Sequence, residues 1–297
     1  MNQIRADVLI VQNKLAPSRE RAQALIAAGF AYANGARIQK ASQKLSDADE
    51  IEIRGDVCPY VSRGGFKLAK AIEVFHADVR GAVCIDVGAS TGGFTDVLLQ
   101  NGASRVYAVD VGTAQLDARI AADPRVVSME KTNARTLCRA DFPVPPTIGV
   151  MDVSFISILK ILPALRDVLG EQGQILTLIK PQFEAGRVAI GKNGVVSKIE
   201  THRRVLRDIQ ANAPQCGWRV RAMDFSPIQG GDGNLEFLAD LVPADSGAPA
   251  DAIDIDSIVR RAHAAFRENK ANIQASDSSA KACSASRTAS GDSSELI

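Results

Sequence analysis

The chain has 297 residues, of which 46% are hydrophobic, and a formal net charge of +1 at pH 7. This length allows one large domain and a small one, and the balanced charge neither favours nor excludes a polyanionic partner. The five cysteines never occur as CxxC and the three histidines are isolated, so neither a disulfide framework nor a metal site is expected. The N-terminus has no secretory pattern and no apolar run could span a membrane, which predicts a cytoplasmic protein without a membrane partner.

Residues 1–54 are predicted to form a small α+β domain. ADVLIVQNKL has helical apolar spacing, and Ser18 is expected to cap a second helix that stops at Gly29. Asn34-Gly35 lies between two short strand-like runs and predicts a hairpin, and IEIRG predicts a further strand.

This domain carries an excess of basic side chains, with seven lysines and arginines against two acidic residues in positions 1–46. Local basicity of this kind indicates a nucleic-acid partner. The cations expected to form one phosphate-binding surface are Lys14, Arg19, Arg21, Arg37 and Lys40. An ordinary solvated helix face explains the charge equally well.

From about residue 80 to residue 243, apolar strands alternate with helices, which predicts a mostly parallel, seven-stranded sheet covered on both faces. The strand-like segments are AVCIDV, RVYAVDV, RVVSM, TIGVMDV, GQILTLIK, WRVRAMDF and NLEFLADLV. The last two are close in sequence, so at least one is expected to be antiparallel. Residues 55–79 are predicted to be a linker and the start of the catalytic domain. Residues 244–297 are predicted to be a short amphipathic helix and a disordered Ser-rich tail.

The segment DVGASTGGF, residues 86–94, leads from a strand into a helix and is a candidate ligand loop. Gly88 permits a sharp turn, and Gly92 and Gly93 allow a ligand to approach the backbone at the helix N-terminus. Tight packing of helix on strand is the structural alternative.

Two carboxylates indicate which ligand this loop would take. Asp86 would repel the pyrophosphate of a dinucleotide, but it favours the ammonium and sulfonium groups of S-adenosylmethionine. Asp110 ends the next strand, where an acidic side chain commonly accepts hydrogen bonds from ribose hydroxyls. The pair therefore favours S-adenosylmethionine over NAD as the cofactor.

Four charged residues, far apart in sequence, stand where strands of an α/β sheet are expected to end: Lys67, Asp152, Lys180 and Glu236. Two lysines and two carboxylates at one edge of the sheet could deprotonate a poor acid such as a sugar hydroxyl. By spacing alone, four unrelated surface charges are the commoner explanation.

Motifs over residues 1–243 resemble the TlyA family, once called haemolysin A. The motifs that carry the resemblance are VSRGGFKLAKAIE, DVGASTGGFTDVLLQ, MDVSFIS, LIKPQFE and GNLEF. SRERAQALIAAGF with NGARI resembles the alpha-L RNA-binding domain of the ribosomal-protein S-four kind. The resemblance implies a Rossmann-like, FtsJ-like, S-adenosylmethionine-dependent methyltransferase domain after a small α+β alpha-L RNA-binding domain. It also implies 2'-O-methylation of cytidine in ribosomal RNA or ribosomal subunits, in the large subunit and often the small one.

The resemblance also assigns roles to residues of this sequence. It implies that the catalytic set is Lys67, Asp152, Lys180 and Glu236. It implies that the cofactor is bound by Asp86, Gly88, Ser90, Gly92, Gly93, Asp110 and Asn133, with Glu130 near the adenine. The chain departs from the family at Ala6, where leucine is usual, and at Thr113, where an aromatic residue is common.

The mechanism expected from this set makes Lys180 the base and Lys67 the neighbouring cation, while the two carboxylates orient both lysines. Three alternatives remain at this stage. The fold could serve as an inactive RNA-binding assembly factor or as a secreted pore-former. It could also be a C5-methyltransferase with a cysteine nucleophile, but neither Cys58 nor Cys84 has a suitable setting. The sequence makes no prediction of the oligomeric state.

Overall fold

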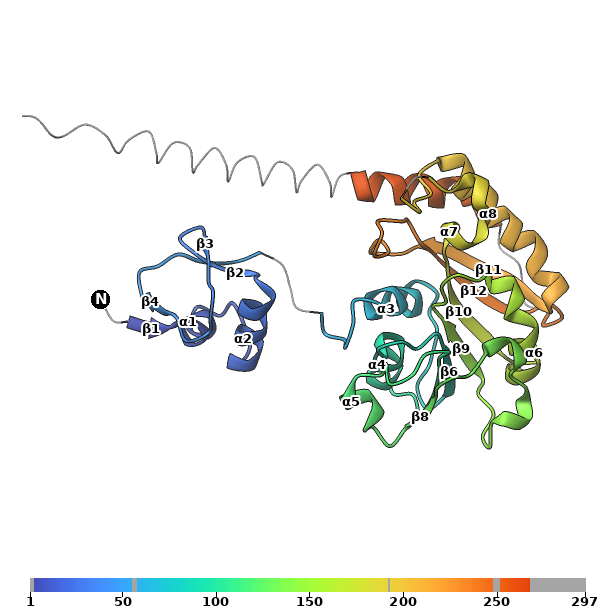
Figure 1. The fold of residues 1–297 in the computed structure, drawn as a ribbon, viewed down its shortest axis with the longest axis horizontal. Coiled ribbons are helices and arrows are strands. Elements are labelled where there is room, and N and C mark those ends of the chain that lie inside the picture. The colour runs from blue at the N-terminus through green and yellow to red at the C-terminus, as the bar shows by residue number, and fades with distance from the viewer. Residues whose placement is uncertain (1–2, 55–57, 192, 248–251, 268–297) are drawn as a thin grey trace, which may run out of the picture. The chain divides into compact units, whose positions relative to one another are not determined.

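A computed structural model describes residues 3–54, 58–191, 193–247 and 252–267 of the chain. The chain divides into two compact units, Met1–Pro59 and Tyr60–Ile297 (Figure 1). The helix that carries Lys67 belongs to the second unit.

The first unit is a small α+β domain, and the predicted helices and hairpin are confirmed. Its elements are β1 (Gln3–Arg5), α1 (Ala6–Gln12), α2 (Arg19–Ala28), β2 (Ala31–Ala33), β3 (Ala36–Arg37), β4 (Lys44–Ser46) and β5 (Ile51–Ile53). The Ser18 side chain caps α2 by accepting a hydrogen bond from the Arg21 backbone N–H at 3.2 Å, and Gly29 ends the helix at φ 80°. Strands β1 and β4 form an antiparallel pair that the sequence pattern did not reveal.

A buried carboxylate joins α1 to α2. Asp7 is fully buried and accepts hydrogen bonds from the side chains of Arg5, Arg19 and Gln23 at 2.8–3.0 Å. The bond from the Arg5 guanidinium holds the pKa of this carboxyl well below its usual range. Ala6 is also fully buried, so a small side chain fits beside this ion pair.

The second unit contains the predicted seven-stranded sheet, in the order β11-β12-β10-β9-β6-β7-β8. Its strands are β6 (Val83–Val87), β7 (Arg105–Val109), β8 (Val126–Met129), β9 (Ile148–Met151), β10 (Gln174–Ile179), β11 (Trp218–Phe225) and β12 (Phe237–Pro243). The pairs among β6 to β10 are parallel, whereas β12 runs antiparallel to both β10 and β11. The expectation of one antiparallel strand at the end of the domain is therefore confirmed.

Helices cover both faces of this sheet (Figure 1). The α-helices are α3 (Gly65–Val74), α4 (Gly93–Gln100), α5 (Ala118–Ala121), α6 (Leu162–Leu169), α7 (Pro181–Glu184) and α8 (Ile199–Asn212). The 3-10 helices are η1 (Ala134–Thr136), η2 (Arg139–Asp141), η3 (Ile158–Lys160), η4 (Arg187–Ala189) and η5 (Ala213–Cys216). One hydrophobic cluster joins α3 and α4 to the sheet, and a second joins α6 and α8 to the opposite face. Cys84 lies fully buried in the first cluster, as the sequence predicted.

A last helix spans residues 255–267 and confirms the amphipathic helix predicted after residue 243. Ile255, Ile258, Val259 and Ala262 are at most 5% exposed and belong to the same cluster as α6 and α8. The Ser-rich tail predicted from the sequence lies outside the described residues.

The Asp7→Asn substitution is expected to destabilise the first unit by about 2 kcal/mol, because it weakens several buried, charge-assisted hydrogen bonds at once. The carboxylate is ionised in the folded unit, so its contribution is complete above about pH 4 and fades as the pH falls further. Denaturant unfolding at pH 7, with hydrogen exchange to localise the loss to α1 and α2, measures the effect. Glu50→Gln, which removes the same charge from an exposed side chain, should leave both measurements unchanged; equal behaviour of the two variants would contradict this role of Asp7.

Candidate active site

A cavity of about 380 Å³ lies at the carboxyl ends of β6, β7 and β9. Ligands of open α/β sheets commonly bind at this edge. Of the predicted cofactor residues, those that line it are Gly88, Ser90, Asp110 and Asn133. Asp152, from the predicted catalytic set, lines the same cavity.

Gly88 lets the loop after β6 pass directly against the end of β9. It has a φ of 83°, and a Cβ atom there would lie 2.5 Å from the Asp152 carbonyl oxygen. Any other residue would displace the backbone that carries the Asp152 carboxylate. Gly92 and Gly93 are not among the described residues that line the cavity, and a Cβ on Gly93 would collide with Ser62. Gly93 thus allows the start of α4 to pack closely against the segment that leads into α3, which is not the helix-on-strand contact of the structural alternative.

Asp86 lies beneath the loop and is fully buried. One of its oxygens accepts a hydrogen bond from the Thr95 hydroxyl at 2.7 Å, and Oδ1 has no hydrogen-bond partner among the described residues. Burial raises the pKa of this carboxyl to about 7. A buried carboxylate oxygen without a partner suits a ligand that brings a cation.

Asp110 holds the cavity's loops together through its carboxylate. It accepts hydrogen bonds from the backbone N–H groups of Ser90 at 2.8 Å and Gly112 at 2.7 Å. Each carboxylate oxygen can accept more than one bond, so both can still accept bonds from hydroxyl groups of a ligand. Asn133 caps η1 by accepting a bond from the Arg135 backbone at 3.1 Å, and its position in the cavity wall is fixed in this way.

The four charged residues predicted as a catalytic set lie in one connected cluster. The Lys67 ammonium is 2.6 Å from a Glu236 oxygen and 3.7 Å from an Asp152 oxygen. The Lys180 ammonium is 2.6 Å from the other Asp152 oxygen and donates a hydrogen bond to the Ser154 hydroxyl at 3.1 Å. The two 2.6 Å contacts are ion pairs, and the two carboxylate oxygens in them, Asp152 Oδ1 and Glu236 Oε2, have no hydrogen-bond partner among the described residues.

Burial separates this cluster from ordinary surface charges. The side chains are 9% exposed for Lys67, 20% for Asp152, 12% for Lys180 and 2% for Glu236. Charged side chains are almost never buried to this degree unless they are paired. Two cations and two anions also balance one another, so the geometry does not fit four unrelated surface charges.

The structure corrects two of the expected positions. Asp152 and Lys180 directly follow β9 and β10, as predicted, but Lys67 lies within helix α3. Glu236 precedes β12 instead of ending a strand. Because β12 is antiparallel, with Phe237 paired to Ile179 at the end of β10, the start of β12 lies at the same edge as the ends of its neighbours.

Phe155 is a feature of the cavity wall that the sequence interpretation did not single out. Its side chain is 91% exposed, its φ is 64°, and its ring lies 5.0 Å from the ring of Phe183. A large exposed aromatic residue in a left-handed conformation is uncommon. The signal in the sequence was its place in MDVSFIS, three residues after Asp152.

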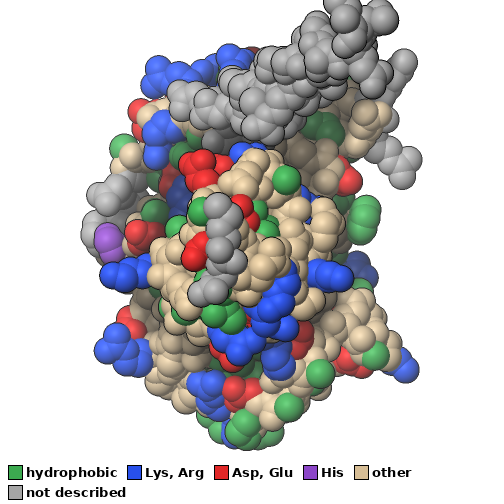
Figure 2. Space-filling view, turned by 90° about the vertical axis from the view of Figure 1, so that its left-hand side faces the viewer, with side chains coloured by type: hydrophobic (Ala, Val, Ile, Leu, Met, Phe, Trp, Pro, Cys, Tyr) green, Lys and Arg blue, Asp and Glu red, His purple; other side chains and the backbone are tan. Residues whose placement is uncertain are grey.

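The five predicted RNA-binding cations differ in their surroundings. Four of them, Lys14, Arg19, Arg37 and Lys40, are exposed. Arg19 pairs with buried Asp7, Arg37 packs against the Gly29 backbone, and Arg21 is half-buried. Figure 2 shows lysine and arginine side chains in groups, with carboxylates among them, on the face that it displays.

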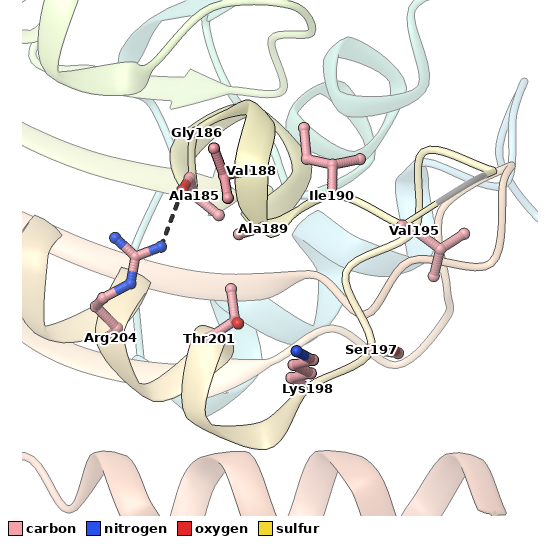
Figure 3. Close-up of a pocket in the computed structure, with 11 residues that line it drawn as sticks. Ala185, Gly186, Val188, Ala189, Ile190, Val195, Ser197, Lys198, Thr201 and Arg204 are labelled. Carbon is pink, nitrogen blue, oxygen red and sulfur yellow. Dashed lines mark hydrogen bonds between the residues drawn. The ribbon is translucent and has the colours of Figure 1, made fainter.

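A second cavity, of about 540 Å³, lies between the segment after α7 and the start of α8. Figure 3 shows Lys198, Thr201 and Arg204 across this cavity from residues 185–190. Arg204 donates a hydrogen bond to the Ala185 carbonyl at 2.9 Å, and no carboxylate is among the described residues that line the cavity.

Comparison with known proteins identifies the family. Residues 60–241 match the model of the FtsJ-like methyltransferases. The chain belongs to the FtsJ-like methyltransferase family. The matched residues include the whole charged cluster and the loop after β6.

The relatives of this chain include TlyA proteins. YqxC of Bacillus subtilis is 43% identical over 273 residues, which cover 91% of this chain and 97% of the relative. The 16S/23S rRNA (cytidine-2'-O)-methyltransferase TlyA of Mycobacterium tuberculosis is 40% identical over 241 residues, covering 79% of this chain and 88% of that protein. A solved structure from Streptococcus thermophilus, which carries a hemolysin name, is 47% identical with a TM-score of 0.72. It covers 91% of this chain and 99% of its own.

In the part of the chain that the structure describes, no helix is both long and apolar enough to cross a membrane. Nor do His, Cys, Asp or Glu side chains form a group of three or more there that could hold a metal ion.

The raised pKa of Asp86 predicts how stability changes with pH. Between about pH 4 and about pH 7 the folded methyltransferase unit holds a proton that the unfolded chain releases, so stability falls as the pH rises. Asp86→Asn should remove this loss and make the ligand-free protein more stable than the parent at pH 8, by about 1 kcal/mol or more. Denaturant unfolding at pH 5 and pH 8 measures it, with exposed Glu171→Gln as control; an unchanged pH slope in Asp86→Asn would contradict the assignment.

Proposed function

We propose that this chain transfers a methyl group from S-adenosylmethionine to the 2'-oxygen of cytidine in ribosomal RNA of the large subunit. One observation carries the proposal: the buried cluster of two lysines and two carboxylates meets the cofactor-sized cavity at Asp152. Family membership and the name of the Mycobacterium tuberculosis relative support the reaction and the substrate.

The residues around the cavity fit this cofactor. Asp110 lines the cavity and can accept bonds from the cofactor's ribose hydroxyls. Asp86 does not itself line the cavity, but it directly precedes the lining residues Val87 and Gly88, and its unpartnered Oδ1 suits the ammonium group of the cofactor. Asn133 stands in the wall where the adenine would lie. When bound, the sulfonium supplies an activated methyl group, so the protein has mainly to position the reactants and remove a proton.

The contacts of the two lysines support a division of labour between them. Among the residues that the structure describes, Lys67 contacts two carboxylates within 4 Å, whereas Lys180 contacts one. Two carboxylates fix the position of the Lys67 side chain, whose positive charge can stabilise negative charge that develops on the ribose oxygen. Lys180, with a single carboxylate partner and the Ser154 hydroxyl, is the better candidate for the base: its ammonium group first releases a proton to solvent, and the neutral amine then takes the proton from the 2'-hydroxyl.

RNA binding is proposed for the first unit and for the second cavity. Exposed Lys14 and Lys40 are free of the structural ion pair that occupies Arg19, so they suit phosphate contacts. Lys198 and Arg204 line a cavity that starts just beyond α7, the short helix that follows Lys180. Phosphate contacts at these places would position the strand, and the exposed Phe155 offers a surface on which an unstacked base can pack.

Lys180→Ala is expected to lower kcat for methyl transfer by about 10²- to 10⁴-fold, because a positioned base contributes that much. Binding of RNA and of S-adenosylmethionine should stay within about twofold of the parent. A filter assay with labelled cofactor and ribosomal subunits measures both, with exposed Lys160→Ala as the matched control. Near-normal kcat in Lys180→Ala would rule out its role as base.

The double substitution Lys14→Ala with Lys40→Ala should weaken RNA binding and flatten its salt dependence. Each lost phosphate contact is expected to reduce the slope of log K against log salt by about 0.7–0.9. Titration of a ribosomal RNA fragment at several salt concentrations measures the slope. An unchanged slope, together with unchanged affinity, would remove these two lysines from the RNA surface.

A further inference from the structure

The helix of residues 255–267 lies beyond the residues that match the methyltransferase family, which end at 241. It is nonetheless firmly attached to the methyltransferase unit. Asp256 pairs with Arg203 at 2.7 Å and with Arg207 at 2.9 Å, both on α8. Apolar burial and these ion pairs hold the helix in one position on α8 (Figure 1). Two separate chains of polar contacts connect this helix to the Lys67–Glu236 ion pair, one starting at His263 and the other at Arg261.

The first route runs from His263 to the loop before Glu236. The His263 ring nitrogen Nε2 lies 2.9 Å from Nδ1 of His202, and Nε2 of the fully buried His202 lies 3.1 Å from the Val196 carbonyl. Since a carbonyl only accepts, His202 carries its proton on Nε2 and accepts a bond from His263. The Val196 N–H in turn donates to the Asn234 side chain at 2.9 Å.

Asn234 connects these contacts to the Glu236 carboxylate. It is 1% exposed, and its side chain also donates to the Gly194 carbonyl at 3.1 Å. Its own carbonyl accepts a bond from Gly230, where a Cβ atom would lie 2.6 Å from a Glu236 oxygen. The loop that Asn234 fixes is therefore packed against the carboxylate that binds Lys67. The His202 ring also contacts Phe237, the residue after Glu236, with ring centres 5.5 Å apart.

The second route runs from Arg261 to the helix that carries Lys67. Arg261 donates to Asp224 at 3.0 Å, and the other oxygen of Asp224 lies 2.9 Å from the Lys70 ammonium. Lys70 also donates to the Phe225 carbonyl. Lys70 stands one helical turn after Lys67 on α3, so this bridge fixes the rotation and height of the helix that presents Lys67.

We propose that helix 255–267 is a positioning element for the catalytic ion pair, with His263 acting on Glu236 and Arg261 acting on Lys67. Neither side chain is proposed to touch the substrate. The inference rests on the proposed methyl-transfer function for its activity readout, but its structural part stands independently.

A loosened ion pair should slow the chemical step and leave substrate binding alone. Misplacement of a catalytic group by about 1 Å can cost about 10²-fold in rate. His263→Ala and Arg261→Ala are each expected to lower kcat by about tenfold or more, with KM for RNA and for S-adenosylmethionine within about twofold of the parent. His263→Gln keeps an N–H donor and Arg261→Lys keeps the charge, so both should recover most of the lost rate. Arg260→Ala, on an exposed position of the same helix, is the matched control.

The experiment is steady-state kinetics of these five full-length variants on ribosomal subunits, together with hydrogen exchange of the loop between Ser226 and Glu236. The inference predicts that His263→Ala loses both kcat and amide protection in this loop, while the folded fraction stays complete. Unchanged kcat, or a change confined to KM for RNA, would overturn it. If the parent protein methylates no RNA, the proposed function fails; the exchange result still decides whether His263 holds the loop.

Discussion

The site depends on an ion pair that water barely reaches. Lys67 and Glu236 lie 2.6 Å apart with side chains 9% and 2% exposed. Moving each ion out of water costs several kcal/mol, which attraction between them offsets only when their geometry is held. Three features hold it: the α3 helix that carries Lys67, the loop in which Gly230 packs against the Glu236 carboxylate, and Asp152, which links the pair to Lys180. A buried pair of this kind suits catalysis, because its charges need no reorganisation during reaction.

Topology explains why residues so far apart in sequence can meet. The parallel strands β9 and β10 bring Asp152 and Lys180 to one edge of the sheet, and antiparallel β12 brings Glu236 there from the opposite chain direction. Gly88 then allows the loop after β6 to lie directly against the end of β9. The cavity and the charged cluster thus share Asp152, which would let the proposed methyl donor and the proposed base act on one substrate atom. The reaction and the RNA substrate that we propose for this geometry are those in the name of the Mycobacterium tuberculosis relative.

Much of the fold and part of the candidate site could be predicted from the sequence, because apolar strands, turn glycines and charges at strand ends leave local patterns. The seven strands, the caps of α2 and the positions of Asp152 and Lys180 are of this kind. The features that the sequence pattern could not predict depend on contacts between segments that are distant in the chain. Lys67 was expected near a strand end but lies on a helix, and β1 and β4 pair across a gap of nearly forty residues. The His202–His263 contact was also missed, since two isolated histidines carry no spacing signal.

The most direct test of the central claim is to map 2'-O-methylcytidine in ribosomal RNA from cells with and without this gene. The account predicts at least one gene-dependent site, in large-subunit RNA, that returns when the parent gene is restored. It does not return with Glu236→Gln, which keeps the side chain's size but removes the charge that Lys67 binds. Absence of any gene-dependent site in either subunit, or full methylation by the Glu236→Gln protein, would contradict it.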